Sequence, residues 1–303
     1  MRKPCPTDDI GLVTVTYESA ALVSYYQETA MQFAHVWIID NHSQDCSAAL
    51  FQHTLLHAEV LALKHNIGFG AANNKGFEKA RLLCKYTLFL NPDCKISIPD
   101  VLLLKEALDL HPEATVACPA VFNSQGICPG IKFRDYTQGY ATQNVQKLDW
   151  SPQLPKIMPN GGIDGACFLV KNEFLHKIGA FDENLFMYSE EDDIGLRLAA
   201  IGQTTVICPH SRAQHLGGAS SRPSLRLKLR KAYHARWSRY YMLNKYAGRR
   251  AQIMAVIKCL LASPIAILLY AFTLQKRHLI KWVGNGLASV DGLFLTRYFR
   301  HLV

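Results

Sequence analysis

The chain has 303 residues, of which 49% are hydrophobic and 19% are charged, and its formal net charge is +9 at pH 7. This composition excludes a disordered chain and suffices either for one large globular domain or for a domain with an appendage. The nine cysteines are scattered, without a Cys-x-x-Cys pair or a zinc-type spacing, so we expect reduced, mostly buried thiols. Residues 1–9 contain no apolar stretch of the secretory type, which predicts that the protein acts in the cytoplasm.

The charge is distributed very unevenly along the chain. Residues 1–193 carry 15 Lys/Arg and 23 Asp/Glu, a net charge of −8, whereas residues 194–303 carry 18 Lys/Arg and the single acid Asp291, a net charge of +17. A large field of one sign attracts polyanions. The C-terminal part is therefore expected to face either an anionic membrane surface or nucleic acid.

Apolar, β-branched runs alternate with helical patterns along the first two thirds of the chain. We expect strands at 10–16, 36–40, 59–63, 86–90, 115–118, 166–170 and 204–208. We expect helices at 20–33, at 43–54 with Ser43 as its N-cap, at 70–85, at 99–110 with Pro99 in its first turn, at 172–178 and at 190–201. This alternation predicts an α/β domain with a mainly parallel sheet, in which ligands bind beyond the carboxyl ends of the strands.

Polar residues stand at the ends of the first two expected strands. Thr14, Thr16 and Tyr17 end the first, and Asp40 and Asn41 end the second. A carboxylate such as Asp40 could accept a hydrogen bond from the imide N–H of a uracil or thymine ring. The residues alone favour ordinary turn chemistry, because Asp-Asn before a serine is a common strand-to-helix turn.

A partial glycine motif follows the third expected strand. It reads Asn66-Ile67-Gly68-Phe69-Gly70, and Asn73 stands where a dinucleotide fingerprint would have its third glycine. A dinucleotide site is therefore not expected. Small residues that open a helix still allow a phosphate to approach its N-terminus, and the alternative is close packing of that helix on the sheet.

Two further motifs contain candidate metal ligands. Asp93 follows Asn91 and Pro92 after the fourth expected strand, where its carboxylate would suit Mg²⁺ or Mn²⁺, although such a tripeptide is also an ordinary turn. His215 precedes Gly217, Gly218 and Ser220, and the glycines permit a segment that could close over a bound substrate.

Four adjacent acids, Glu190, Glu191, Asp192 and Asp193, precede an amphipathic helical pattern. They repel one another, and the helix dipole contributes only about 0.3–1 kcal/mol for each exposed charge. A bound cation or a proton-transfer role would explain the cluster. The alternative is a solvated acidic first turn.

In this order and spacing the motifs resemble the inverting family 2 glycosyltransferases, which have the GT-A fold, and particularly their bacterial rhamnosyltransferase-like branch. The resemblance covers residues 10 to about 250 and rests on 14–17, 40–45, 66–70, 73–76, 90–93, 179–183, 186–197 and 215–220. It implies a nucleotide-diphospho-sugar transferase with a Rossmann-like sheet over residues 1–220. The nucleotide-sugar half would be about 1–95, the acceptor half about 96–220, and a basic, apolar helical tail would occupy 221–303.

The resemblance also implies roles for individual residues. The donor would contact Thr14, Thr16, Tyr17, Asp40, Asn41, Asn66, Gly68, Phe69, Asn73 and Asn91. Asp93 would hold the metal, His215 could complete the coordination of metal or diphosphate, and Asn91 replaces the first acid of the family's Asp-x-Asp-like motif. Glu191 would be the general base, between Glu190 and Asp193 at the neighbouring acidic positions, and Asp192 is a second candidate for the base. The segment 161–166 would lie near the acceptor, with Asp164 and Gly165 in contact with it, although a glycine-rich turn is the alternative for Asp164.

The implied reaction is transfer of a sugar with inversion of configuration. L-rhamnose from dTDP-L-rhamnose is the first choice of donor, and the acceptor would be a polyprenyl-diphosphate-linked glycan in O-antigen, capsule or cell-wall assembly.

The tail combines a basic segment with an apolar one. Residues 222–250 hold ten Lys/Arg and no acid, and the uncharged core 259–274 has 16 residues, short of the roughly 20 that a span needs, and contains Pro264. This pattern predicts interfacial helices on an anionic inner leaflet, and hence a peripheral protein on the cytoplasmic side of a bacterial inner membrane. Helices packed on the body, or a homodimer seam, are the alternatives for the apolar residues.

Two other functions compete with glycosyl transfer. A basic, aromatic tail could bind nucleic acid with a steep salt dependence, but that function gives no role to Asp93 or Glu191, so no nucleic acid partner is expected. A sugar nucleotidyltransferase would open with a glycine-rich, arginine-containing loop after the first strand, and this loop is absent from the sequence.

Overall fold

The computed structural model describes residues 6–138, 142–146, 151, 153–160, 162–217 and 224–296. Outside the described residues lie Cys5, Gly161 of the expected acceptor segment, Gly218 to Ser220 of the expected closing segment, and 221–223 and 297–303 of the tail. The chain divides into two compact units. The sheet unit comprises Met1–Phe133, Asn144–Glu183 and Glu191–Ser221, and the helical unit comprises Arg134–Gln143, Asn184–Glu190 and Arg222–Val303.

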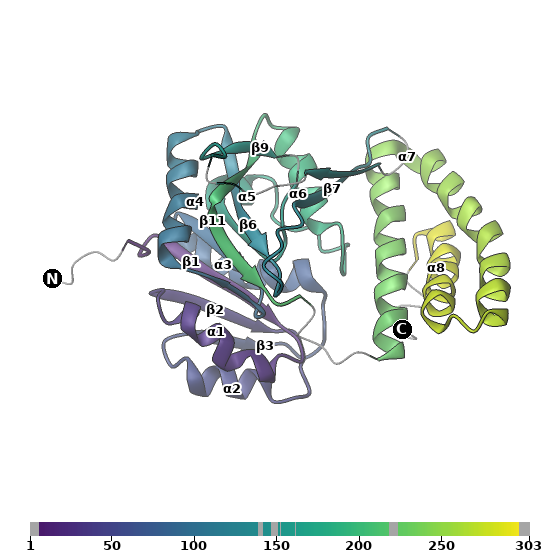
Figure 1. The fold of residues 1–303 in the computed structure, drawn as a ribbon, viewed down its shortest axis with the longest axis horizontal. Helices are drawn as coiled ribbons and strands as arrows, with labels where there is room; N and C mark the ends of the chain where they lie inside the picture. The colour runs from purple at the N-terminus through teal and green to yellow at the C-terminus, as the bar shows by residue number, and fades with distance from the viewer. Residues whose placement is uncertain are drawn as a thin grey trace. The chain divides into compact units, whose positions relative to one another are not determined.

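The sheet unit is built on a sheet that has nine strands among the described residues, in the order β3-β2-β1-β4-β10-β6-β11-β5, with β9 also paired to β11 (Figure 1). The strands are β1 Ile10–Thr16, β2 His35–Asp40, β3 Glu59–Ala62, β4 Tyr86–Leu90, β5 Cys94–Ile96, β6 Ala114–Phe122, β9 Met158–Asn160, β10 Cys167–Lys171 and β11 Thr204–His215. A separate two-stranded sheet pairs β7 (Ile131–Asp135) with β8 (Thr142–Gln146).

Strand direction divides the large sheet. β3, β2, β1 and β4 are parallel, whereas β10 is antiparallel to both of its neighbours, β4 and β6. The chain leaves β1 toward β2 and β3 and returns to β4 on the other side of β1, so the order of the strands reverses beside β1. Such a switch point is where open α/β sheets bind ligands.

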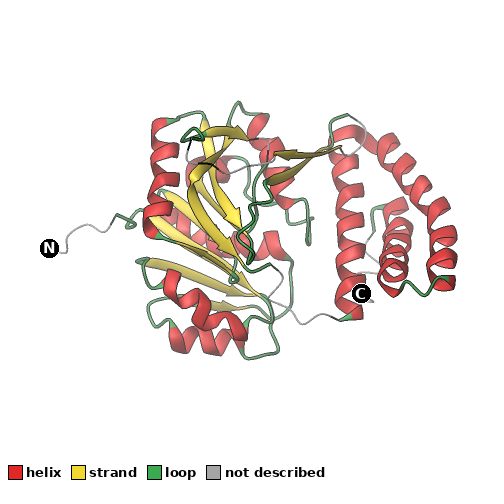
Figure 2. Ribbon diagram, viewed as in Figure 1, coloured by secondary structure: helices red, strands yellow, loops and turns green. Residues whose placement is uncertain are grey.

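Helices cover both faces of this sheet, as Figure 2 shows. They are a 3₁₀ turn at Ala20–Leu22, α1 Val23–Ala30, α2 Ser47–Thr54, α3 Phe69–Leu83, α4 Ile98–Leu110, α5 Asn172–Lys177 and α6 Glu190–Ala199. Alternate residues of β1 point to opposite faces: Leu12 packs with Tyr26 of α1 in one core, and Val13 packs with Phe77 of α3 in the other. The predicted α/β fold with flanking helices is confirmed, and the antiparallel strands make the sheet a mixed one.

Two details of the expected helices were wrong. Ser43 does not cap α2, because that helix begins at Ser47 after Cys46, and the Ser43 hydroxyl donates instead to Asp40 Oδ1 at 2.6 Å. The helix expected at 20–33 is a 3₁₀ turn followed by an α-helix that ends at Ala30. Pro99 does lie in the first turn of α4, whose N-cap is Ser97.

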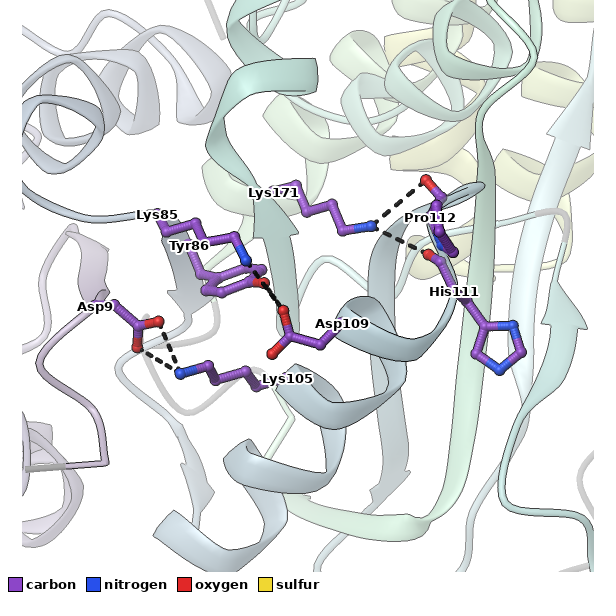
Figure 3. Close-up of polar contacts among 8 residues, drawn as sticks. All are labelled: Asp9, Lys85, Tyr86, Lys105, Asp109, His111, Pro112 and Lys171. Atoms are coloured by element: carbon purple, nitrogen blue, oxygen red, sulfur yellow. Dashed lines mark hydrogen bonds and ion pairs between the residues drawn. The ribbon is translucent and has the colours of Figure 1, made fainter.

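Side chains of α4 form ion pairs and hydrogen bonds with residues at the start of β1 and β4 (Figure 3). Lys105 of α4 pairs with Asp9, and Asp109 of α4 accepts hydrogen bonds from Tyr86 and from Lys85 Nζ, the latter at 3.1 Å. Lys171, at the end of β10, donates to the His111 carbonyl at 3.1 Å beyond the last turn of α4. A lysine at that point donates to a carbonyl that has no N–H donor within the helix.

The helical unit contains two long helical segments, α7 (Leu225–Phe272) and α8 (Lys276–Phe294). Gly248 has φ 83° and ψ 167°, a conformation that is essentially restricted to glycine, and it divides α7 into two arms, 225–247 and 249–272. α8 packs against both arms (Figure 1): a Cβ at Gly292 would lie 2.7 Å from Tyr240 of the first arm and 3.1 Å from Val256 of the second. The helical character expected of the C-terminal region is confirmed.

Candidate active site

Asp93 and His215 meet because β5 and the end of β11 are paired. His215 is the register partner of Cys94, and Asp93 directly precedes that cysteine. His215 Nε2 lies 3.1 Å from Asp93 Oδ1, and the Leu216 N–H donates to the Asp93 carbonyl at 2.9 Å. The hydrogen bond with Asp93 raises the pKa of His215, although burial lowers it. The structure thus brings together the two expected metal ligands.

Asp40, the last residue of β2, is 3% exposed and has hydrogen-bond donors from the end of β1 and from the loop after β2. Its carboxylate accepts hydrogen bonds from the Thr16 hydroxyl at 3.0 Å and from the Ser43 N–H at 3.0 Å. The neighbouring Tyr17 N–H donates to Ser19 Oγ at 3.2 Å. Thr14 is fully buried, where its hydroxyl contacts Tyr26 and donates to the Leu90 carbonyl at 2.8 Å.

Asn41 joins the end of β2 to the glycine motif. Its amide donates to Asn66 Oδ1 at 3.1 Å and to the Gly68 carbonyl at 3.2 Å, and its oxygen accepts from the Ile67 N–H at 2.9 Å. Gly68 has φ 98° and directly precedes α3, so the loop turns sharply into the helix. The expected donor residues Asn41, Asn66 and Gly68 therefore form one hydrogen-bonded loop at the carboxyl ends of the strands.

Other expected donor residues lie nearby but are already engaged. Phe69 packs edge-on against Phe181, with ring centroids 6.4 Å apart. The Asn73 side chain is buried and donates to the Phe69 carbonyl at 3.1 Å within α3. The Asn91 N–H donates to the Ala166 carbonyl at 2.9 Å, which ties the turn before Asp93 to the expected acceptor segment.

Glu191, in the first turn of α6, reaches Gly165 of that segment. A Cβ built on Gly165 would lie 1.9 Å from Glu191 Oε1 and 2.8 Å from its Cδ, so the glycine leaves space that the carboxylate fills. Glu191 is only partly buried, as a proton acceptor open to a substrate must be. The expected base and the expected acceptor segment are therefore in contact.

Asp164 directly precedes this contact, in a segment that the hydrogen bond from the Asn91 N–H to the Ala166 carbonyl joins to the turn before Asp93. Burial raises the pKa of Asp164, and the Ala166 N–H that donates to its Oδ1 at 3.0 Å and the imidazole of His215 lower it in part. The segment 164–166 thus meets Glu191 at Gly165 and the turn before Asp93 at Ala166. Through this segment the sheet unit connects Glu191 to the Asp93 and His215 pair.

The remaining acids of the 190–193 run have different surroundings. Asp193 is fully buried and forms an ion pair with Arg197 at 2.6 Å, and Arg197 also donates to the carbonyls of Ile178 and Ala180 at 2.6 Å. Glu190 is 1% exposed, whereas Asp192 is partly exposed like Glu191. Glu191 and Asp192 are therefore the accessible members of the run.

A divalent cation fits the Asp93 and His215 pair by the chemistry of its donors. Within the described residues, no group of three or more His, Cys, Asp or Glu side chains could hold a metal ion alone. Mg²⁺ and Mn²⁺ do not require such a cage, because they take one or two carboxylates and complete their shell with water and substrate phosphates. A buried carboxylate beside an imidazole matches this need.

Sequence reasoning missed two features that position the site. Asn74 donates to the Phe181 carbonyl at 3.0 Å and to Glu183 Oε1 at 3.1 Å, and it accepts from the Phe181 N–H, so it fastens α3 to the loop after α5. Asn74 lies in the motif 73–76 and its partners in the motif 179–183, but no role was expected for it. Tyr188 and Ser189 both have positive φ, at 73° and 69°, directly before the acidic run. No glycine marks that turn, so the sequence carried no signal for it.

Residues 14–153 match the family model described as glycosyl transferase family 2. The chain is 24% identical over 212 residues to the low-salt glycan biosynthesis hexosyltransferase Agl10 of Haloferax volcanii, an alignment that covers 66% of each protein. It is 23% identical over 243 residues to the N-acetylglucosaminyl-diphospho-decaprenol L-rhamnosyltransferase of Mycobacterium tuberculosis, covering 69% of this chain and 76% of that one. The chain therefore spans about two thirds of the first relative's length.

Solved structures share the fold at low sequence identity. The mannosyltransferase PcManGT from Pyrobaculum calidifontis, solved with GDP-Man and Mn²⁺, matches with a TM-score of 0.55 and 14% identity over 94% of this chain and 89% of that chain. Residues 1–349 of TarS from S. aureus, solved with UDP, match with a TM-score of 0.51 and 11% identity over 96% and 93%. GalNAc-T7, solved with UDP, GalNAc and Mn²⁺, matches with a TM-score of 0.56 and 16% identity over 76% of this chain and 50% of that chain. These likenesses show the GT-A fold. The family match over residues 14–153 and the two curated relatives together support a family 2 glycosyltransferase.

Proposed function

We propose that this protein is an inverting glycosyltransferase that moves a sugar from a nucleotide donor to a hydroxyl of a lipid-linked glycan in the assembly of a bacterial surface polysaccharide. The observation that carries the proposal is that the segment 164–166 contacts the carboxylate of Glu191 and is hydrogen-bonded to the turn before Asp93, which pairs with His215. A donor diphosphate at Asp93 and an acceptor hydroxyl at Glu191 would then meet across that segment.

Glu191 is proposed as the general base. The acceptor hydroxyl gives its proton to this carboxylate while its oxygen attacks the anomeric carbon, and the bond from that carbon to the diphosphate oxygen breaks with its electron pair going to the diphosphate. A positioned base contributes about 10²–10⁴-fold to such a step. Asp192 is the second candidate. The ion pair of Asp193 with Arg197 supports a structural role for that acid.

Asp93 and His215 are proposed to hold Mg²⁺ or Mn²⁺ against the donor diphosphate. A divalent cation bound there would supply positive charge that stabilises the leaving diphosphate. The loop built from Thr16, Asp40, Asn41, Asn66 and Gly68 is proposed to contact the nucleoside. Asp40 keeps acceptor capacity for one N–H of the base, because a carboxylate can accept about four hydrogen bonds and the described contacts use three.

L-rhamnose from dTDP-L-rhamnose is the proposed donor sugar, and a glycan on a polyprenyl diphosphate is the proposed acceptor. Support comes from the mycobacterial relative, whose name specifies both an L-rhamnosyl transfer and a diphospho-decaprenol acceptor. Asp164 and Gly165 are the proposed acceptor contacts in the sheet unit.

The protein is proposed to lie on the cytoplasmic face of the inner membrane through residues 221–303. By length and composition, α7 is the one helix among the described residues that could cross a membrane. Its second arm carries an exposed apolar stripe one helical face wide, formed by Met254, Ile257, Leu261, Ile265, Leu268 and Phe272. The buried face of the same arm carries Gln252, Cys259 and Ser263 beside Val256. Polar residues inside and large apolar residues outside are typical of helices that contact lipid.

Thermal unfolding with nucleotides tests the proposal. UDP, GDP and dTDP would each be added with and without Mn²⁺ to the wild type and to Asp93→Ala, because a ligand that binds only the folded state raises its stability. We expect one nucleotide to stabilise the wild type in the presence of Mn²⁺ and this effect to be lost in Asp93→Ala. Absence of a shift with every nucleotide, in protein shown to be folded, would contradict the donor site.

A further inference from the structure

The helical unit contains a cavity of about 320 Å³ that no part of the proposed chemistry uses. It lies between the two arms of α7 and α8. Its charged lining is Arg236, Arg239 and Lys258, and its apolar lining includes Leu243, Met254 and Trp282. A volume of this size accommodates a small charged group and a few carbon atoms.

The cations of this cavity have no carboxylate to neutralise them within the part of the chain that the structure describes. From residue 222 onward the only acid is Asp291, and its carboxylate accepts hydrogen bonds from the hydroxyls of Tyr233 and Thr296. Arg236 and Arg239 are only partly exposed, and burial together with the neighbouring Arg236 lowers the pKa of Arg239. Two partly buried guanidinium groups that line one cavity are stabilised when an anion binds between them.

The apolar wall of the cavity continues along the surface of α7. Met254 lines the cavity and is also the first residue of the apolar stripe, which ends at Phe272, 90% exposed. At 1.5 Å per residue the stripe is about 27 Å long. A ligand with an anionic head at the arginines could therefore lay a hydrocarbon chain along the stripe.

We propose that this cavity binds the diphosphate of a polyprenyl-diphosphate lipid, with Arg236, Arg239 and Lys258 around the phosphates and the prenyl chain leaving past Met254. The inference rests on the proposed function only for the identity of this lipid as the carrier of the acceptor. Arginine suits the task because its planar fork of donors matches phosphate oxygens in pairs. An anionic phospholipid of the bilayer offers a similar head, and the experiment separates the two sources.

The test measures binding of farnesyl diphosphate to the full chain in detergent, with inorganic pyrophosphate and phosphatidylglycerol as competitors. Arg236→Gln with Arg239→Gln removes the anion site. Arg226→Gln with Lys231→Gln is the matched control, because it removes two exposed cations of the same arm that do not line the cavity. Ala255→Phe fills the cavity at constant charge. Helix content by circular dichroism verifies that each variant is folded.

We expect farnesyl diphosphate to bind the wild type and the control equally, and both Arg236→Gln with Arg239→Gln and Ala255→Phe to weaken this binding at least tenfold. Pyrophosphate should compete poorly because it lacks the chain. Equal weakening by the control pair would overturn the site in favour of a diffuse charge effect. Displacement by equimolar phosphatidylglycerol would overturn the assignment to the carrier lipid.

Nucleotide binding, measured on the same protein samples, separates this inference from the proposed function. Retained farnesyl diphosphate binding without any nucleotide shift would remove the proposed function and leave the lipid site intact. Suppose instead that a nucleotide raises the melting temperature in a way that depends on Asp93, while the cavity variants do not change the binding of farnesyl diphosphate. That result would support the proposed function and overturn the lipid site.

Discussion

The carboxylate of Glu191 occupies the space in which a side chain at Gly165 would begin. A Cβ at that glycine would lie 1.9 Å from Glu191 Oε1, far inside contact distance. Gly165 is not one of the glycines with positive φ, so its backbone would accept an L residue. The glycine is thus required by the side chain of Glu191 rather than by its own conformation.

Replacement of Gly165 by alanine should therefore move Glu191 without damaging the fold. The atom that blocks the new methyl group is the far end of a flexible side chain, which can rotate away. If Glu191 is the base, we expect the turnover number to fall by about 10²-fold or more while the KM for the donor and the melting temperature stay close to wild type. Steady-state kinetics and thermal unfolding of Gly165→Ala check this. An unchanged turnover number would show that Glu191 is not the general base.

The accessible and buried acids of the run 190–193 should respond differently to neutral substitution. Glu191→Gln keeps the shape of the side chain but cannot accept the proton, so we expect about 10²–10⁴-fold lower turnover with normal stability. Asp192→Asn should retain most activity. A reversal of these two results would move the base to Asp192, and pH–rate profiles of both variants would show which acid titrates in the reaction.

Asp193→Asn should instead destabilise the fold. Arg197 would keep its two carbonyl partners but lose the carboxylate of a fully buried side chain, and breaking a buried pair costs about 3–5 kcal/mol, at the lower end here because Arg197 is 19% exposed. Urea unfolding measures the loss. Wild-type stability together with strongly reduced turnover would contradict the structural role.

Lowering the pH should weaken the polar contacts shown in Figure 3, because it protonates the carboxylate of Asp109. Burial alone would raise the pKa of Asp109, but hydrogen bonds from Tyr86 and Lys85 lower it below its ordinary value. A carboxyl group whose pKa is lower in the folded state stabilises the fold above the unfolded-state pKa of about 3.9 and loses this contribution as the pH falls below it.

We therefore expect Asp109→Asn to lose less stability than the wild type between about pH 6 and pH 3. The difference should be below about 1 kcal/mol, because the Asp109 side chain is 41% exposed. Urea titrations at the two pH values measure it, and Tyr86→Phe, which removes one donor, should give an intermediate result. An Asp109→Asn variant with the same acid sensitivity as the wild type would refute this role.

Central strands were predictable because every residue of β1 and β4 is buried, which produces uninterrupted apolar, β-branched runs. The start of β11 at Thr204 was predicted, but its C-terminal end was not predictable. Pro209, His210 and Ser211 interrupt its apolar pattern and coincide with an irregular register, yet the strand continues to His215 and carries it to Asp93. The short strands β8 and β9 lack a period-two pattern, and the alternation of apolar and charged residues in β7 extends over only four residues.

The site could be predicted in its parts but not in its contacts. Asp40 and His215 end strands, Asp93 follows one, and Glu191 lies in the first turn of a helix, which are places that sequence patterns can predict. The approach of Glu191 to Gly165 depends on how α6 packs against the segment before β10, a long-range relationship that no local pattern contains. The strained turn at Tyr188 and Ser189 is also set by tertiary structure, because neither residue favours positive φ.

The break of α7 at Gly248 gives a final prediction, in which two glycines of the helical unit respond to alanine in opposite directions. At φ 83° and ψ 167° an alanine costs about 1–3 kcal/mol of backbone strain, although no atom lies within 4 Å of the new Cβ. Gly286 lies within α8, where a new Cβ would lie 3.6 Å from the Cβ of Ser263, an ordinary contact, and alanine there should stabilise the helix by about 0.5–1 kcal/mol. Chemical unfolding followed by helical circular dichroism compares Gly248→Ala and Gly286→Ala. Equal stability of the two variants would mean that α7 continues through residue 248 without the break.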